Sequence, residues 1–216
     1  MPDLNDLPRT YSPPPVSADE AEPAFSHPSG GAPWEDVARW RKAERARLID
    51  ERMQMSADKR LAGSERIARK LDRAIGKAGN RIVSLYWPFK GEPDLRHWLI
   101  TVLERGARIA LPVVVEKKAP LEFRLWSPGE PLERGIWNIL VPSNGAVVLP
   151  DIVIAPVVGF DAANFRLGYG GGYFDRTLAG APRKPLTIGV GYQASRIETI
   201  RPQPHDIPMD LVVTDA

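Results

Sequence analysis

Apolar positions recur at helical spacing in the first third of the chain and predict two consecutive helices. The first is expected from Trp34 to about Met55, because Val37, Leu48 and Met55 fall on one stripe of a helical wheel. Three arginines at positions 41, 45 and 52 cluster within about 40° of each other, directly beside that stripe. Their guanidinium groups are therefore expected to reach the cleft where the helix docks. The second helix is expected over residues 57–77.

Further along the chain, short apolar runs alternate with helical patterns. Buried strands are expected at residues 81–86, 108–115, 151–155, 186–190 and 211–214, and a half-exposed edge strand at 121–126. A helix is expected to open at Pro93 and Asp94. This order predicts one α/β domain with a mainly parallel sheet and helices on both faces. In such sheets, ligands bind at the carboxyl ends of the strands.

Composition adds an amino-terminal extension to this picture. Eight of the 22 prolines lie in residues 1–33, with few large apolar residues, so we predict a disordered acidic extension there and a folded domain over 34–216. Residues 1–36 carry seven acids against one arginine, whereas residues 39–81 hold fourteen basic residues against six acids. That basic density indicates an anionic partner (nucleic acid, membrane or a phosphorylated ligand) or else a solvated helix face.

The residue types that the chain lacks narrow its chemistry. It has no cysteine, which excludes disulfides, thiolate catalysis and cysteine-ligated zinc, and which fits the reducing cytoplasm where we expect the protein. No apolar run approaches the roughly 18 residues of a membrane-spanning helix. The amino terminus also lacks the basic and apolar regions of a signal peptide, so we expect no secretion.

The most informative segment runs from Asn164 to Arg176, between a predicted strand and a short helix. Its glycines, at 168 and 170–172, allow positive φ angles and a close backbone approach to a ligand. Consecutive N–H groups before a helix form an anion cradle, and Arg166 adds a cation that can bind phosphate through two hydrogen bonds. The glycine spacing matches neither the dinucleotide fingerprint nor the P-loop. Phosphate binding and a merely flexible turn therefore both stay open.

This segment resembles the signature loop of the 5-formyltetrahydrofolate cyclo-ligases, also called methenyltetrahydrofolate synthetases. Four further segments agree in the same order: residues 41–45 (Arg-Lys-Ala-Glu-Arg), 91–94 (Gly-Glu-Pro-Asp), 136–139 (Ile-Trp-Asn-Ile) and 204–210 (Pro-His-Asp-Ile-Pro-Met-Asp). The resemblance covers roughly residues 36–216. It implies an enzyme that uses ATP and Mg²⁺ to convert 5-formyltetrahydrofolate into 5,10-methenyltetrahydrofolate, releasing ADP and phosphate. It also implies that the formyl oxygen takes the γ-phosphoryl group before the second folate amine closes the ring.

The resemblance implies roles for residues on the nucleotide side. Arg41 and Arg45 would contact ATP phosphates, although most relatives have lysine at the first position, so Lys42 is an alternative there. Arg166 and Tyr173 would act in catalysis. The nucleotide-binding set would also include the loop residues Leu167, Gly168, Tyr169, Gly170, Gly171, Gly172, Tyr173 and Phe174. Two of these depart from the family pattern, because some relatives have lysine in place of Gly171 and the usual second tyrosine is replaced by Phe174.

On the substrate side, the resemblance implies that Glu92 accepts hydrogen bonds from the pterin ring, with Trp87, Trp137 and Tyr173 lining the folate pocket. From the residues alone, Glu92 could instead cap a helix, and both tryptophans could instead pack in the core.

The metal site implied by the resemblance consists of Asp175 and Asp206. Mg²⁺ prefers oxygen ligands and takes one or two carboxylates together with water and phosphate. From the residues alone, Asp175 could equally be an acid that interacts with a helix dipole.

Two other functions stay open. A nucleic-acid-binding relative would use the basic helices without needing paired carboxylates, so Asp175 and Asp206 together favour the enzyme. We therefore expect no nucleic-acid or membrane partner, and a monomer, as is common in the family. An ATP-using enzyme acting on a different formylated, pterin-like substrate would share the nucleotide side. Only residues near Glu92 and Trp137 would distinguish it.

Overall fold

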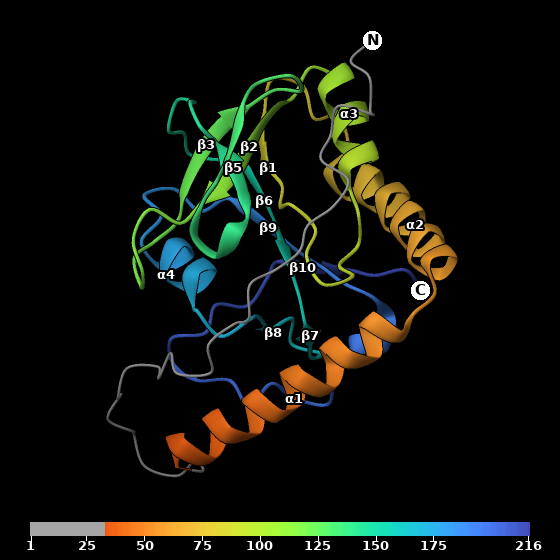
Figure 1. Cartoon of the computed structure of the whole chain (residues 1–216), viewed down its shortest axis with the longest axis vertical. Coiled ribbons are helices and arrows are strands. Elements are labelled where there is room, and N and C mark those ends of the chain that lie inside the picture. The colour runs from red at the N-terminus through yellow and green to blue at the C-terminus, as the bar shows by residue number, and fades with distance from the viewer. Residues whose placement is uncertain (1–32) are drawn as a thin grey trace.

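The computed structural model describes residues 33–216, and a six-stranded sheet forms the centre of this part of the chain (Figure 1). In spatial order the strands are β10 (Leu211–Val213), β9 (Leu186–Val190), β6 (Ile152–Pro156), β1 (Ile82–Ser84), β2 (Arg108–Val113) and β3 (Glu122–Trp126). Neighbouring strands from β10 to β2 pair parallel, and β3 pairs antiparallel with β2 at one edge. The mainly parallel sheet and the edge strand are thus confirmed. The extension predicted for residues 1–33 lies, apart from Pro33, outside the described residues.

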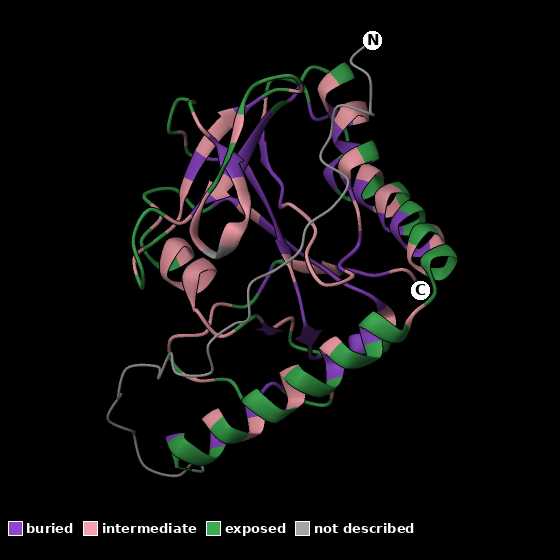
Figure 2. Cartoon of the chain, viewed as in Figure 1, coloured by how far each residue is buried: buried purple, intermediate pink, exposed green. Residues whose placement is uncertain are grey.

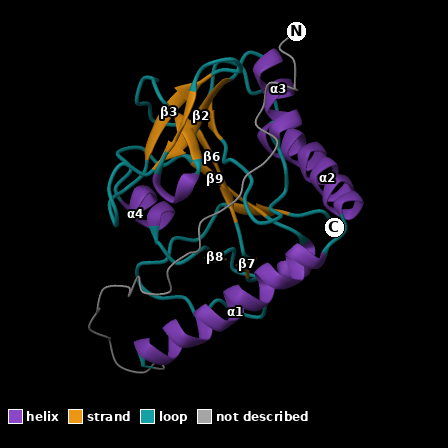
Figure 3. Ribbon diagram, in the orientation of Figure 1, coloured by secondary structure: helices purple, strands orange, loops and turns teal. Residues whose placement is uncertain are grey.

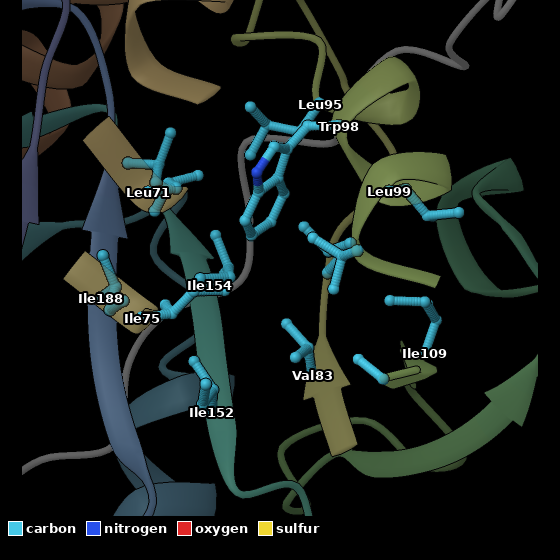
Figure 4. Close-up of a cluster of buried hydrophobic side chains, with 14 of the residues drawn as sticks. Leu71, Ile75, Val83, Leu95, Trp98, Leu99, Ile109, Ile152, Ile154 and Ile188 are labelled. Carbon is cyan, nitrogen blue, oxygen red and sulfur yellow. The ribbon is translucent and has the colours of Figure 1, made fainter. Parts of the chain in front are cut away.

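Helices cover both faces of the sheet, as expected (Figure 3). On one face, α2 (Ala57–Ile75) and α3 (Arg96–Glu104) enclose the main core, where Leu71, Trp98 and Ile154 pack together (Figure 4). Alternate side chains of the same strands point the other way. There Phe174 of α4 (Tyr173–Ala179) packs against a second cluster that includes Val153.

The long helix α1 (Trp34–Gln54) lies below the sheet in Figure 1 and packs on segments that follow the carboxyl end of β6. Its Leu48 forms a small cluster with Val158, Leu167 and Ile200. The buried positions along α1 recur on one side of the helix (Figure 2) and include arginines as well as apolar residues. The basic face predicted from the helical wheel is therefore turned partly inward.

Several local elements differ from the sequence prediction. Helix α3 begins at Arg96 rather than at Pro93, because the carboxylate of Asp94 accepts the Arg96 N–H at 3.0 Å before the first turn. Short elements without a sequence signal are β4 (Leu132–Arg134), β5 (Leu140–Pro142), β7 (Gly159–Phe160), β8 (Arg166–Leu167) and the 3₁₀ turns η2 (Ile136–Asn138) and η3 (Gln193–Ser195). Within residues 33–216, no helix has both the length and the apolar character that crossing a membrane requires.

Candidate functional site

The glycine-rich loop connects β8 to α4 and is shaped by residues with left-handed backbone angles. Gly172, at φ 60° and ψ 16°, occupies the position just before α4, and Gly170 has a φ of 102°. Helix α1 approaches this loop through Arg45, whose Nε donates to the Gly168 carbonyl at 2.8 Å. A Cβ at Gly170 would lie 3.3 Å from the guanidinium carbon of Arg45. The loop therefore has little room for a side chain there and carries a cation along its edge.

Two more arginines flank the loop. Arg166 is buried, lies 5.1 Å from the Phe174 ring centroid and donates to Asp175 at 2.8 Å. Arg176 lies 5.3 Å from the Tyr173 ring centroid and donates to a carbonyl of the loop. The Nε atoms of both arginines are buried without a hydrogen-bond partner among the described residues.

An unpaired buried donor is costly, and both guanidinium groups lie near aromatic rings beside the loop where an anion cradle was expected. The sequence reasoning had missed Arg176. The signal that could have found it is its position one helical turn after Gly172, at the amino end of the helix where the anion cradle was expected.

Arg41, the first arginine expected at the phosphates, is buried and bonded within the protein. Its guanidinium contacts both carboxylate oxygens of Asp206, at 3.2 and 2.5 Å, and donates to the carbonyls of Ile200 at 3.0 Å and Arg201 at 2.9 Å. These bonds use four of its five N–H groups. The adjacent Lys42 is exposed. Arg41 therefore holds the 200–206 segment against α1, and its direct contact with phosphate stays a prediction.

The two aspartates expected at the metal lie on adjoining segments. Asp175 accepts from Arg166 and, through Oδ1, from the N–H of Ile207 at 3.2 Å, next in sequence to Asp206. Each aspartate is thus paired with an arginine. Across residues 33–216, no group of three or more histidines and acids is placed to hold a metal ion. Two carboxylates fit Mg²⁺ when phosphate oxygens and water complete its coordination, so this assignment stays a prediction.

Glu92, the expected pterin ligand, is buried at 5% exposure in the turn that follows β1. Its Oε2 accepts the Phe89 N–H at 2.8 Å, and its Oε1 accepts the Tyr169 hydroxyl at 2.9 Å. Burial raises the pKa of Glu92 from 4.5 to about 7, although the charge of Arg52 and these two hydrogen bonds oppose the shift. The carboxylate bonds to its own turn and to the glycine loop and does not cap α3, which begins at Arg96.

The aromatic residues expected near the substrate differ in what surrounds them. Trp87 is half-buried, packs edge-on against Trp126 with ring centroids 5.8 Å apart, and joins the main core. Trp137 lies in η2, and its side chain is outside the described part of the chain. The Tyr173 hydroxyl accepts the Lys118 N–H at 3.4 Å. Core packing thus accounts for Trp87, while the substrate contacts of all three stay predictions.

Arg52 connects the glycine loop to the turn that carries Glu92. The helical wheel placed it beside Arg41 and Arg45 at the cleft, but no ligand was predicted for it. From the last turn of α1 it donates to the Lys90 carbonyl at 2.9 Å and to the Tyr169 hydroxyl at 2.6 Å. The end of α1, the turn after β1 and the glycine loop are therefore bonded to one another. This is the carboxyl-end location that the parallel sheet predicted.

Comparison with known proteins assigns a family to this arrangement. The chain is 33% identical over 146 residues to the 5-formyltetrahydrofolate cyclo-ligase of Mycolicibacterium smegmatis, covering 64% of this chain and 75% of the relative. It is 32% identical over 139 residues to the Haemophilus influenzae protein of the same name, covering 61% and 74%. The Aquifex aeolicus 5,10-methenyltetrahydrofolate synthetase structure superposes with a TM-score of 0.70 at 29% identity, over 81% of this chain and 89% of the other.

A structure from Mycoplasma pneumoniae superposes over 82% of this chain and 99% of its own length, with a TM-score of 0.67 and 23% identity, which supports the fold. The model of the 5-formyltetrahydrofolate cyclo-ligase family matches residues 37–215, from the first turn of α1 to the segment after β10, and so spans the glycine loop, the buried glutamate and both aspartates. This chain belongs to the 5-formyltetrahydrofolate cyclo-ligase family.

Proposed function

We propose that this protein uses ATP and Mg²⁺ to cyclise 5-formyltetrahydrofolate to 5,10-methenyltetrahydrofolate. The names of its relatives support this activity. The observation that carries the proposal is the direct contact between the glycine loop and Glu92, made by the Tyr169 hydroxyl at 2.9 Å. A cradle suited to phosphate and a buried carboxylate suited to ring N–H groups are thereby held side by side. A reaction that transfers a phosphoryl group from ATP to the formyl oxygen of a pterin-containing substrate needs both.

The nucleotide side consists of the loop N–H groups and three arginines: Arg45, Arg166 and Arg176. Phosphoryl transfer depends mainly on positioning and on neutralising the charge of the phosphate oxygens, which cations and N–H donors supply. The guanidinium groups of Arg166 and Arg176, bonded to Asp175 and to a carbonyl of the loop, would supply positive charge for this purpose. For Arg41 we propose an indirect role, since most of its N–H groups hold Asp206 and the 200–206 segment. The next residue in sequence, Lys42, is exposed.

Asp175 and Asp206 would hold Mg²⁺ together with phosphate oxygens, and the bound ion would supply further charge neutralisation. When no ion is bound, Arg166 holds Asp175 in position and Arg41 holds Asp206.

The proposed reaction has two steps. The formyl oxygen forms a bond to the γ-phosphorus of ATP as the bond to ADP breaks. The second folate amine then attacks the formyl carbon and loses its proton, and the carbon–oxygen bond breaks to release phosphate. In this scheme Glu92 accepts pterin N–H groups and orients the ring, Tyr173 and Arg166 lie at the reacting end, and Trp87 and Trp137 border the pocket. We also propose that the protein acts as a cytoplasmic monomer.

The test is a spectroscopic assay of the purified full-length protein. The methenyl product absorbs in the near ultraviolet, and its appearance should require 5-formyltetrahydrofolate, ATP and Mg²⁺. Arg45→Met should raise the KM for ATP at least about tenfold, because it removes the cation bonded to the loop. Arg47→Met is the matched control, since Arg47 pairs with glutamates on the exposed side of the same helix. ATP hydrolysis without the methenyl product would point to a different substrate, and salt-sensitive RNA binding without ATP use would refute the proposal.

A further inference from the structure

Tyr169 occupies an unusual position, because the residue is 41% exposed while its hydroxyl lies between two buried charged residues, Arg52 and Glu92. The hydroxyl accepts from Arg52 at 2.6 Å and donates to Glu92 at 2.9 Å. Its ring lies 5.4 Å from that of Phe89, in the turn that carries Glu92. Tyr169 itself belongs to the glycine loop, between Gly168 and Gly170. One side chain therefore connects the nucleotide loop, the last turn of α1 and the substrate turn.

The direction of these hydrogen bonds is fixed. A hydroxyl has one proton, which here goes to Glu92, so the guanidinium of Arg52 must act as the other donor. Such chains of bonds polarise one another and hold each member in one orientation. The Glu92 carboxylate uses one acceptor site on each oxygen, for Tyr169 and Phe89, and keeps sites for ring N–H groups. The bridge therefore orients the carboxylate while each of its oxygens keeps a further acceptor site.

We propose that Tyr169 is a positioning residue that couples the two ligand sites. A nucleotide that orders the glycine loop holds the Tyr169 hydroxyl in its hydrogen bond to Glu92 and so strengthens binding of the folate substrate. This inference rests on the proposed function. Ordering the loop costs conformational entropy, and the ligand that binds second meets a loop already ordered. By linkage, the folate substrate strengthens nucleotide binding by the same factor.

The loop geometry supports coupling through this residue. Gly168 on one side of Tyr169 is bonded to Arg45, and Gly170 on the other side has a φ of 102°. Tyr169 thus lies between two glycines of the cradle, and its side chain bonds the cradle to Arg52 and Glu92. A change in how the cradle sits on a phosphate must move the hydroxyl relative to Arg52 and Glu92.

The experiment compares Tyr169→Phe with Tyr86→Phe. The Tyr86 hydroxyl donates to the Pro93 carbonyl at 2.9 Å, so the control loses one hydroxyl near the same turn but no bond to Glu92. The Kd of 5-formyltetrahydrofolate is measured by calorimetry with and without the β,γ-imido analogue of ATP and Mg²⁺. Wild type and Tyr86→Phe should bind the folate about five- to tenfold tighter with the analogue, and Tyr169→Phe less than twofold tighter.

A second readout is the pH dependence of folate binding. The groups that face Glu92 are Arg52 from α1, the Tyr169 hydroxyl from the loop, and the Phe89 N–H and the Tyr86 phenol from the segment after β1. The first three lower the pKa of Glu92, and Tyr86 makes no hydrogen bond to it. Without the hydroxyl, the carboxylate should ionise at higher pH, so the rise in folate affinity should move to higher pH in Tyr169→Phe and stay in place in Tyr86→Phe. A loss of stability alone would not produce this shift.

The outcomes separate the two proposals. If wild type binds both ligands and Tyr169→Phe keeps the full coupling factor, or if wild type shows no coupling, the role of Tyr169 is overturned while the proposed function stands. If wild type binds neither ligand, the proposed function fails, and the coupling fails with it.

Discussion

Replacing Arg41 by methionine should lower the free energy of unfolding by about 3–5 kcal/mol, the usual cost of removing one partner of a buried ion pair. The side chains of Arg41 and Asp206 are only 4% and 9% exposed, so water compensates little for the loss. Methionine keeps the apolar stem but removes four hydrogen bonds. The Ile200 carbonyl loses its side-chain donor, and Asp206 and the Arg201 carbonyl keep only the hydrogen bonds from Gln203. For a domain of this size, about 2–4 °C of melting temperature is lost per kcal/mol, so the melting temperature should fall by about 6–20 °C.

The assay is urea unfolding followed by circular dichroism, together with a thermal melt. Lys42→Met is the matched control, because Lys42 is exposed and next in sequence, and it should change stability by less than about 0.5 kcal/mol. The double variant Arg41→Met/Asp206→Asn should lose less than the sum of the two single losses, because the two residues contact each other. An Arg41→Met protein that melts within 2 °C of wild type but binds ATP poorly would refute this reasoning and restore Arg41 as a direct phosphate ligand.

Three further predictions follow from the site and the domain boundary. In the folded protein the pKa of Glu92 is about 7, above its ordinary 4.5, so Glu92 binds its proton more tightly when folded and its contribution to stability is lost as pH rises from 4.5 through 7. In urea unfolding at several pH values, the free energy of unfolding of Glu92→Gln should rise by about 3 kcal/mol relative to wild type as the pH goes from 4.5 to 7. A difference between the two proteins that does not change with pH would refute the raised pKa. Asp175→Asn should cut kcat at least about 100-fold with an unchanged circular dichroism spectrum, whereas Asp36→Asn, at an exposed ion pair, should keep wild-type activity. Deleting residues 1–32 should leave kcat and KM within about twofold, because it keeps Pro33, whose carbonyl accepts the first N–H groups of α1.

The sequence predicts the architecture well where one face of an element is buried. The alternating pattern at 121–126 placed β3 at an edge, and the apolar run at 186–190 matches β9 residue for residue. The prediction failed for the two-residue strands β7 and β8, because so short a pairing is determined by its surroundings and not by periodicity. The start of α3 was misplaced because the Asp94 side chain satisfies the Arg96 N–H two residues after the expected start.

For the candidate site, the sequence predicts where the functional residues lie better than it predicts their hydrogen-bond partners. Residue type and helical spacing put Arg41 and Arg45 on the docking face of α1, one turn apart, and the glycines marked the loop that the helix would meet. Spacing carries no information about a partner 165 positions away, yet that partner determines what each arginine can do. Arg41 meets the carboxylate of Asp206 and holds the 200–206 segment, whereas Arg45 donates to the carbonyl of Gly168 in the glycine loop. Two arginines that are equivalent on a helical wheel therefore bind different segments of the chain, and this difference arises only from tertiary contacts.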